Sequence, residues 1–343
     1  MGPGVEILAM VKADAYGHGA RRVAAALRGV GCRAFGVATV AEAEEIGGEL
    51  DGARVVIFGG LLAADCPRAV ASGAEVVTHE ALVVEALGAA AAAAGTETRV
   101  HIKVDSGMRR LGVEPERAAQ LGRLLQATPG VRPVAVCSHF AKAECVNDEV
   151  TSGQLEGLAA AAAALGAAGL TLKRHLANSA AVMTRRDSHL DMVRPGLMLY
   201  GLYPDRSLHA HAKLRPVMTL DAPVMRVAEA RCGDGVSYGH SYRMSRAGRI
   251  ATLRCGYADG LPRSLSNRGE VLFAAGRAPV AGRVCMDHTM VDVSDLGAVA
   301  AGERAILWGP GLGAEEVAEA AGTIAYELVA RIGRRVEREY VSG

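Results

Sequence analysis

Short apolar runs alternate with helical segments up to about residue 200 of the chain. Eight of these runs have the length and residue types of β-strands: 7–11 (ILAMV), 34–38 (AFGVA), 54–59 (RVVIFG), 75–79 (EVVTH), 100–104 (VHIKV), 133–139 (PVAVCSH), 173–177 (KRHLA) and 190–195 (LDMVRP). They are almost continuously apolar, which is typical of parallel strands buried on both faces. Amphipathic segments such as 19–31 and 114–130 separate them. The pattern predicts a (β/α)8 barrel, with a doubly wound sheet as the competing architecture.

The pattern of hydrophobic and polar residues changes after about residue 215. Shorter, alternating runs separated by Gly-rich turns occur at 222–231, 248–260, 269–294 and 303–309, and a helical pattern follows at 313–333. Alternation of this kind indicates antiparallel strands with one solvated face. We therefore predict two domains, a barrel over 1–212 and a mainly β domain over 213–343.

Composition and charge narrow the function class. The 38 basic and 37 acidic residues nearly cancel, and no basic run is present, which argues against a nucleic-acid-binding surface. Seven cysteines without a CxxC pair favour neither a disulfide framework nor a zinc site. The chain start lacks the pattern of a signal peptide, and no apolar run has the length of a membrane span. We expect a cytoplasmic protein that binds neither membranes nor nucleic acid.

Polar residues follow five of the predicted strands. Because the carboxyl ends of barrel strands meet at one mouth, we expect these side chains to converge there. Each alone has an ordinary interpretation, such as a solvated loop residue or, for an Asn-Ser pair, a helix cap. Together they indicate a site: Lys12 and Tyr16, then Lys103, Asp105 and Arg110, then His139, then Asn178 and Ser179, then Arg194.

The candidate chemistry follows from what these residues offer. No cluster has metal-ligand spacing, and the P-loop, GxGxxG and GxSxG motifs are absent. A desolvated lysine amine beside anion-binding donors suits Schiff-base chemistry, either with a pyridoxal-phosphate cofactor or in an aldolase. The second domain favours the cofactor enzyme, because a simple aldolase barrel does not need it.

A series of motifs resembles the alanine racemase family. The segments are VKADAYGHGA (11–20), KVDSGMRRLG (103–112), SHFAKAE (138–144), HLANSAA (175–181), VRPGLMLYG (193–201), VSYG (236–239), GYADG (256–260), GRVCMDHTMVDV (282–293) and AYELVARIGRRVEREY (325–340). They occur in the family's order and span almost the whole chain. The resemblance implies racemisation of L- and D-alanine with pyridoxal 5'-phosphate, in a homodimer with shared sites, supplying D-alanine for peptidoglycan.

The resemblance also implies a role for each site residue. Lys12 holds the cofactor as a Schiff base and is one catalytic base, and Tyr257 of the second subunit is the other. Cofactor contacts fall to Tyr16, Arg110, His139, Asn178, Ser179, Arg194, Gly196, Leu197 and Tyr326, of which Tyr16, Ser179, Gly196, Leu197 and Tyr326 surround the phosphate. Arg110, Met286 and Asp287 contact the substrate, and Lys103 is a position of lysine carbamylation in the family. His139 and His175 orient Arg194, which faces the pyridine nitrogen.

Arg194 favours racemisation over other pyridoxal-phosphate reactions. A guanidinium keeps its proton, so the ring nitrogen stays largely unprotonated and withdraws electrons weakly. Fold-related decarboxylases usually carry an acidic residue there, and barrel-only carriers lack the second domain. A racemase of another amino acid such as serine, and a catalytically weak paralogue, stay open. Only eleven residues precede Lys12, fewer than is usual in relatives, so we expect a partly exposed barrel bottom.

Overall fold

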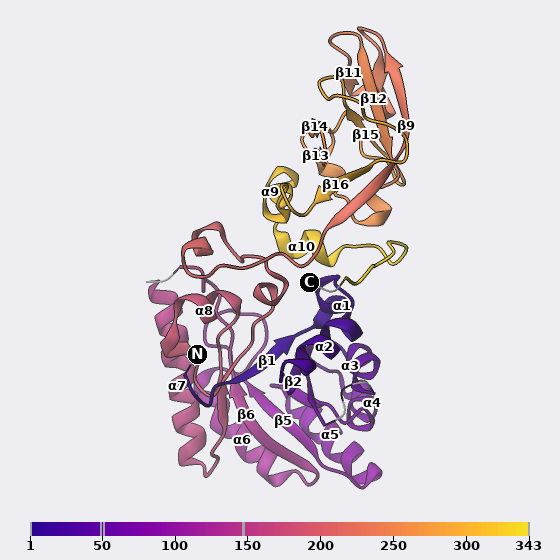
Figure 1. Cartoon of the computed structure of the whole chain (residues 1–343). Helices are drawn as coiled ribbons and strands as arrows, with labels where there is room; N and C mark the ends of the chain where they lie inside the picture. The colour runs from indigo at the N-terminus through magenta and orange to yellow at the C-terminus, as the bar shows by residue number, and fades with distance from the viewer. Residues whose placement is uncertain (1, 49, 51, 146–147, 342–343) are drawn as a thin grey trace. The chain divides into compact units, whose positions relative to one another are not determined.

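The computed structural model describes residues 2–48, 50, 52–145 and 148–341 (Figure 1). The chain forms two compact units. The first comprises Met1–Leu199 and Pro204–Lys213, and the second comprises Tyr200–Tyr203 and Leu214–Gly343.

Eight parallel strands close into a barrel in the first unit. They are β1 (Glu6–Met10), β2 (Ala34–Val37), β3 (Arg54–Ile57), β4 (Glu75–Thr78), β5 (Thr98–Lys103), β6 (Val131–Cys137), β7 (Lys173–His175) and β8 (Met192–Val193). Each strand pairs with the next in the chain, and β8 returns to β1 through Met192 opposite Glu6. The predicted (β/α)8 barrel is confirmed, and the doubly wound sheet is excluded.

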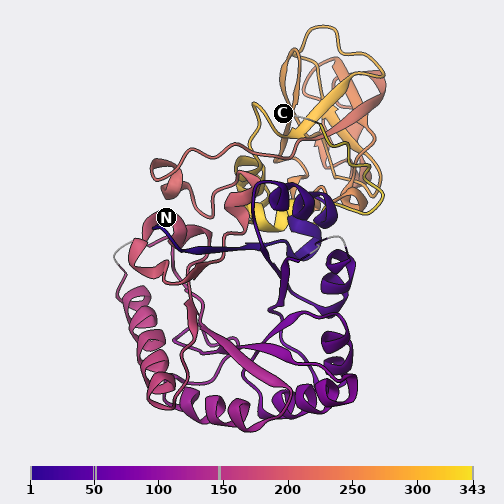
Figure 2. The same cartoon turned by 60° about the horizontal axis from the view of Figure 1, so that its bottom comes forward.

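Helices surround the ring of strands on the outside (Figure 2). They are α2 (Ala20–Gly29), α3 (Val40–Gly47), α4 (Cys66–Ala71), α5 (Ala81–Ala94), α6 (Ala118–Ala127), α7 (Glu149–Ala167) and α8 (Ser179–Thr184), with short 3-10 turns η1 (Ala63–Asp65), η2 (Pro115–Arg117), η3 (Arg186–Ser188), η4 (Leu197–Tyr200) and η5 (Arg206–Ala210). Local side-chain signals start α3 and α7. Thr39 and Glu42 form a capping box on α3, and the Asp148 carboxylate accepts backbone N–H bonds at the start of α7.

Several predicted strand limits were wrong by a few residues. β5 begins at Thr98, two residues before the predicted start. The prediction missed these residues because Arg99 is polar and interrupts the apolar pattern used to recognise strands. The last strand, predicted over 190–195, is only Met192–Val193. Leu190 has φ 49°, a left-handed conformation that cannot continue a strand.

The barrel interior changes character along its axis. Residues two apart on a strand face the same side, and inward-facing residues from alternate strands stack in layers. One apolar cluster of the barrel contains Leu8, Ala34, Val56, Val77, Cys137 and Met192. Charged residues lie at the strand starts on one side of this cluster, and the predicted site residues lie at the strand ends on the other.

A left-handed turn, α1 (Lys12–Tyr16), connects β1 to α2. Ala13, Asp14 and Ala15 all have φ 53°, and Tyr16 has φ 54°. This conformation costs a residue with a Cβ roughly 1–2 kcal/mol. Side chains support the turn: Glu42 accepts from the Ala13 N–H at 2.8 Å, and Asp14 accepts from the Ala20 N–H at 2.7 Å. The sequence indicated only a strand running into a loop at this place.

The second unit is built on antiparallel strands. Its six-stranded sheet has the order β14-β13-β16-β9-β12-β15, and β10 pairs with β11 in a separate ribbon. The elements are β9 (Leu220–Ala230), β10 (Gly235–Val236), η6 (Tyr238–His240), β11 (Tyr242–Arg243), β12 (Gly248–Leu253), η7 (Tyr257–Asp259), η8 (Arg263–Leu265), β13 (Glu270–Phe273), β14 (Gly276–Pro279), β15 (Thr289–Asp292), β16 (Arg304–Trp308), α9 (Ala314–Ala321) and α10 (Ala325–Ala330). The predicted β-rich second domain is confirmed.

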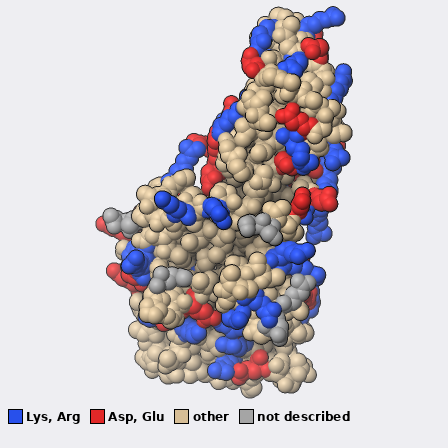
Figure 3. All heavy atoms as spheres, in the orientation of Figure 1, with Lys and Arg blue, Asp and Glu red and all other residues tan. Residues whose placement is uncertain are grey.

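The surface carries both signs of charge. On the face drawn in Figure 3, acidic and basic side chains are interspersed among uncharged ones. Within the described ranges, no helix has both the length and the apolar composition required to cross a membrane.

Candidate active site

Three cations lie at the carboxyl ends of the barrel strands. Lys12 follows β1, Lys103 ends β5, and Arg194 follows β8. Burial, together with the charges of Arg110 and Arg194, lowers the pKa of the Lys12 amine. Burial and the same two arginines lower the pKa of Lys103 to about 8. Because Coulomb effects weaken with distance, the action of Arg110 and Arg194 on both lysines indicates that these four groups lie near the same end of the barrel.

Arg194 is held on several sides. Its side chain is buried, and its Nη1 lies 2.7 Å from Nδ1 of His175. Nη2 donates to the carbonyl oxygens of Ser138 at 2.7 Å and Leu176 at 3.0 Å and lies 3.3 Å from Nδ1 of His139. Burial, then the Arg194 charge, holds the pKa of His139 well below its usual value. Both histidines therefore act as neutral acceptors that fix the guanidinium plane.

Tyr16, Ser179 and Gly196 form a small polar cradle. The Ser179 oxygen accepts from the backbone N–H of Gly196 at 2.8 Å and of Met198 at 3.3 Å, which leaves its own hydroxyl proton to donate. A Cβ on Gly196 would lie 2.5 Å from the Tyr16 hydroxyl oxygen, so only glycine permits this approach. Burial raises the pKa of Tyr16 to about 12, which keeps its hydroxyl protonated at neutral pH. The cradle offers hydroxyl donors suited to an anion.

The other predicted barrel residues have distinct positions. Asn178 caps α8, and its side-chain oxygen accepts from the Ala181 N–H at 3.1 Å. Leu197 is fully buried at the start of η4. Arg110 is exposed, in a loop ordered by the Asp105 carboxylate, which accepts the N–H of Gly107 and Arg109. The geometry of Asn178 matches the helix-cap interpretation of the Asn-Ser pair.

In the second unit, the GYADG segment lies against the CMD segment. The Tyr257 N–H donates to the Cys285 carbonyl at 3.0 Å, and the Ala258 N–H donates to the Met286 carbonyl at 3.1 Å. A Cβ on Gly256 would lie 2.3 Å from both carbonyl oxygens, which explains the glycine. The side chains of Tyr257 and Met286 are 42% and 53% exposed, which leaves both available for contacts outside their unit.

Arg335 joins these two segments and was missed by the sequence analysis. Its guanidinium pairs with Asp259 at 2.7 Å and with Asp287 at 2.7 Å. The hydrogen bonds that its guanidinium donates to these carboxylates raise its pKa. Asp259 also accepts from the Gly256 N–H at 2.8 Å, so it closes the turn that carries Tyr257. The signal was a basic residue in RIGRRVEREY with two acidic candidates upstream, but their pairing depends on the fold.

Met286 and Asp287 also line an open pocket of the second unit with a volume of about 580 Å³. Its other lining residues include Tyr238, His240, Thr252 and Cys285. Tyr326, the remaining predicted residue, is half-buried in α10. The predicted residues thus fall into one group on the barrel and one on the second unit.

Comparisons with known proteins give the relationship of the chain. Residues 1–204 match the alanine racemase N-terminal domain, and residues 217–340 match the alanine racemase C-terminal domain. The chain is 40% identical to the alanine racemase of Chlorobaculum tepidum, covering 98% of this chain and 89% of the relative. It is also 40% identical to the biosynthetic alanine racemase of Pseudomonas aeruginosa, with 98% and 93% coverage.

Solved structures agree with this relationship. The alanine racemase of D-cycloserine-producing Streptomyces lavendulae has a TM-score of 0.95 and 37% identity, over 99% of this chain and 92% of that one. The Bartonella henselae alanine racemase, described with covalently bound pyridoxal phosphate, has a TM-score of 0.89 and 29% identity, with 99% and 93% coverage. These findings separate the chain from the aldolase and barrel-only alternatives. The chain therefore belongs to the alanine racemase family of pyridoxal-phosphate-dependent amino-acid racemases.

Proposed function

We propose that this protein interconverts L- and D-alanine by a two-base mechanism, with Lys12 as one base and Tyr257 of a second subunit as the other. The observation that carries the proposal is the guanidinium of Arg194, fixed by neutral histidines at the mouth where the reactive lysine lies. The relatives of this chain described above are alanine racemases. The product, D-alanine, would serve peptidoglycan synthesis in the cytoplasm.

The residues present fit pyridoxal 5'-phosphate. The cradle of Tyr16, Ser179 and Gly196 offers hydroxyl donors and a glycine with no room for a Cβ, which suits a phosphate. In this proposal Leu197 and Tyr326 would complete the phosphate environment, Asn178 would contact the cofactor, and Arg194 would face the ring nitrogen. When bound, the cofactor supplies an aldehyde for amines and a ring that withdraws electrons from the substrate Cα.

Lys12 acts on one face of the substrate Cα. Its amine must be neutral to accept a proton, and burial with the charges of Arg110 and Arg194 favours the neutral form by lowering its pKa. The strained α1 turn fixes the start of the Lys12 side chain, because its backbone is tied to Glu42 and Ala20 through Ala13 and Asp14. A base so restrained reaches one side of the reacting carbon only.

Tyr257 of the partner acts on the opposite face. A single base cannot readily serve both sides of a planar carbon, so inversion needs a second group. The exposed Tyr257 and Met286, side by side in one unit, suit insertion into a partner's barrel mouth. There the Met286 backbone N–H and Asp287 would help hold the substrate carboxylate, and Arg335 would keep the two segments in register.

Lys103 supports Arg110 in this proposal. A lysine reacts with carbon dioxide only as the neutral amine, and a pKa of about 8 leaves a substantial neutral fraction near physiological pH. The resulting carbamate is an anion, which would pair with the Arg110 guanidinium and orient it toward the cofactor and the substrate. Carbon-13 NMR with labelled bicarbonate tests this, and a Lys103→Met variant without the signal identifies the site.

A chiral assay tests the function directly. Purified protein with added cofactor is given L-alanine, D-alanine, L-serine and other amino acids, and the enantiomers are separated over time. We expect alanine to racemise fastest. Faster serine turnover would change the substrate, and no racemisation of any amino acid would overturn the proposal.

Tyr257→Phe tests the two-base mechanism. The equilibrium constant of racemisation is one, so kcat/KM must fall equally in both directions, by roughly 10²- to 10⁴-fold. In deuterated water, however, one enantiomer should still exchange its α-proton at Lys12 without inversion. Loss of exchange for both enantiomers, or for neither, would contradict separate one-face roles.

A further inference from the structure

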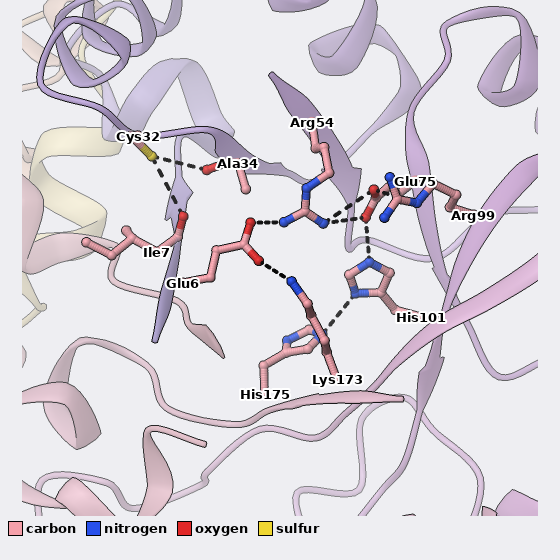
Figure 4. Close-up of polar contacts among 10 residues, drawn as sticks. All are labelled: Glu6, Ile7, Cys32, Ala34, Arg54, Glu75, Arg99, His101, Lys173 and His175. Atoms are coloured by element: carbon pink, nitrogen blue, oxygen red, sulfur yellow. Dashed lines mark hydrogen bonds and ion pairs between the residues drawn. The ribbon is translucent and has the colours of Figure 1, made fainter. Parts of the chain in front are cut away.

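A chain of buried hydrogen bonds runs through the barrel from Arg194 towards the amino ends of the strands. Arg194 Nη1 lies 2.7 Å from His175 Nδ1, and His175 Nε2 lies 2.9 Å from His101 Nδ1. His101 Nε2 lies 2.8 Å from a carboxylate oxygen of Glu75. Figure 4 shows the part of this chain formed by Glu75, His101 and His175, whose two imidazoles lie edge to face. Both imidazoles are fully buried.

The chain has a single consistent direction. Arg194 has only donors, so His175 Nδ1 must accept, and its proton must be on Nε2. His175 Nε2 then donates to His101 Nδ1, which forces the His101 proton onto Nε2. Glu75 ends the chain as an acceptor. Each link thereby sets the tautomer of the next.

The electrostatics agree with two neutral imidazoles and one carboxylate. Burial lowers the pKa of His101, and burial with the Arg194 charge holds the pKa of His175 well below its usual value. Burial tends to raise the pKa of Glu75, but the His101 hydrogen bond and the charges of Arg54 and Arg99 outweigh it and lower that pKa. Arg54 lies 3.2 Å from Glu75, and Arg99 also lies 3.2 Å from it.

We propose that Glu75 and His101 are positioning residues that lock the tautomer of His175, so that Arg194 keeps a fixed hydrogen-bond acceptor. The proposal rests on the function of Arg194 proposed above. Glu75 begins β4, and its polar partners among the described residues are His101, Arg54 and Arg99, none of which is assigned to cofactor or substrate. It can therefore act on Arg194 through the chain. A carboxylate cannot donate, whereas an amide can do either. Glu75→Gln therefore no longer fixes the direction of the hydrogen bonds in the chain, although the side chain keeps nearly the same shape.

The test is nitrogen-15 NMR of histidine-labelled holoenzyme, with signals assigned through a His101→Gln variant. We expect His175 to show one neutral tautomer protonated on Nε2, and Glu75→Gln to add a population protonated on Nδ1. In that population two donors face each other at Arg194, so kcat should fall about tenfold while KM changes less than about twofold.

Glu6→Gln is the matched control. Glu6 is another carboxylate at the amino ends of the strands, where it pairs with Arg54 and, at 2.9 Å, with Lys173. Neither partner belongs to the hydrogen-bond chain Glu75–His101–His175–Arg194, which we call the relay. We expect one His175 tautomer and rates near those of the unmodified protein. A loss of kcat as large in Glu6→Gln as in Glu75→Gln would overturn the proposal in favour of a general structural role.

Two results distinguish a failure of the relay proposal from a failure of the proposed function. A Glu75→Gln protein that keeps one His175 tautomer and full kcat would overturn the relay alone. A protein that racemises nothing would overturn the function, whatever its tautomers. If Glu75→Gln does not fold, the unmodified holoenzyme still decides, because a His175 proton on Nδ1 contradicts the relay directly.

Discussion

The two ends of the barrel treat charge in opposite ways. At the amino ends, Arg54, Arg99 and Lys173 are each paired with Glu6 or Glu75. At the carboxyl ends, burial lowers the pKa of Lys12, Lys103 and Arg194, and the charge of Arg110 adds to this effect on each of them. At the amino ends, the basic side chains are neutralised by the neighbouring glutamates. The carboxyl ends concentrate positive charge, which is the condition for binding an anionic cofactor and an amino-acid carboxylate.

This contrast separates stability from chemistry within one ring of strands. Paired groups lower the energy of the folded chain without a ligand, whereas crowded cations raise it until an anion binds. Substitutions at the two ends should therefore have different signatures.

The largest expected effect is that of Lys12→Ala. On the proposed mechanism, loss of the Lys12 amine removes both the covalent attachment of the cofactor and one base, so racemisation should fall by more than about a thousandfold. Borohydride reduction followed by peptide mapping measures attachment, and the chiral assay measures rate. Lys173→Ala is the control at the other end, and it should keep both. Cofactor attached to a different lysine would refute the assignment.

Arg54→Met should affect folding. It leaves Glu6 and the buried Glu75 with fewer cations, at a cost of about 2–4 kcal/mol in the free energy of unfolding. Urea denaturation of the holoenzyme measures the loss. Arg68→Met removes an exposed pair with Glu44 and should leave stability near that of the unmodified protein. Equal stability of the two variants would show that the ion pairs at the amino ends contribute no more than an exposed surface pair.

Lys103→Met should change how stability depends on pH. The folded pKa of about 8 lies below the ordinary value of 10.5, so protonated Lys103 destabilises the folded state fully below pH 8. That penalty disappears as pH rises from 8 to 10.5, so stability should increase relative to the variant by about 3 kcal/mol across this window. Urea titrations in bicarbonate-free buffer measure it, and parallel curves would contradict the lowered pKa.

Gly196→Ala should have the smallest effect. The new Cβ would meet the Tyr16 hydroxyl oxygen at 2.5 Å and displace it, which should weaken cofactor binding about tenfold, the equivalent of one hydrogen bond. Gly166→Ala in α7, where the Cβ has open space, is the control. Cofactor titration followed by absorbance compares them. Unchanged affinity in Gly196→Ala would show that the cradle does not bind the phosphate.

Sequence patterns predicted the barrel because its strands are apolar on both faces. They also located Lys12, Lys103 and Arg194, since polar residues at strand ends meet at one mouth. The Glu75–His101 link was missed because His101 lies within an apolar run. A signal existed: charged residues begin several strands, as in Glu75 and Lys173, and His101 lies two residues before Lys103 on the same face of β5.

The α1 turn could not be predicted from local sequence. Alanine, aspartate and tyrosine give no sign of four successive left-handed residues, for which glycine is the usual signal. The conformation depends on a tertiary contact, the Glu42 carboxylate on the Ala13 N–H, from a residue on a different helix. The Arg335 bridge escaped prediction for the same reason, because Asp259 and Asp287 meet it only after folding.

The left-handed turn also has a stereochemical consequence. Ala13 and Ala15, with ψ of 53° and 50°, have the mirror image of an ordinary helical backbone. D-alanine favours this backbone for the same steric reason that L-alanine avoids it. A semisynthetic chain with D-alanine at these positions should therefore gain stability. The segment that carries the proposed catalytic lysine has a backbone better suited to the proposed product than to the residues that the ribosome inserts.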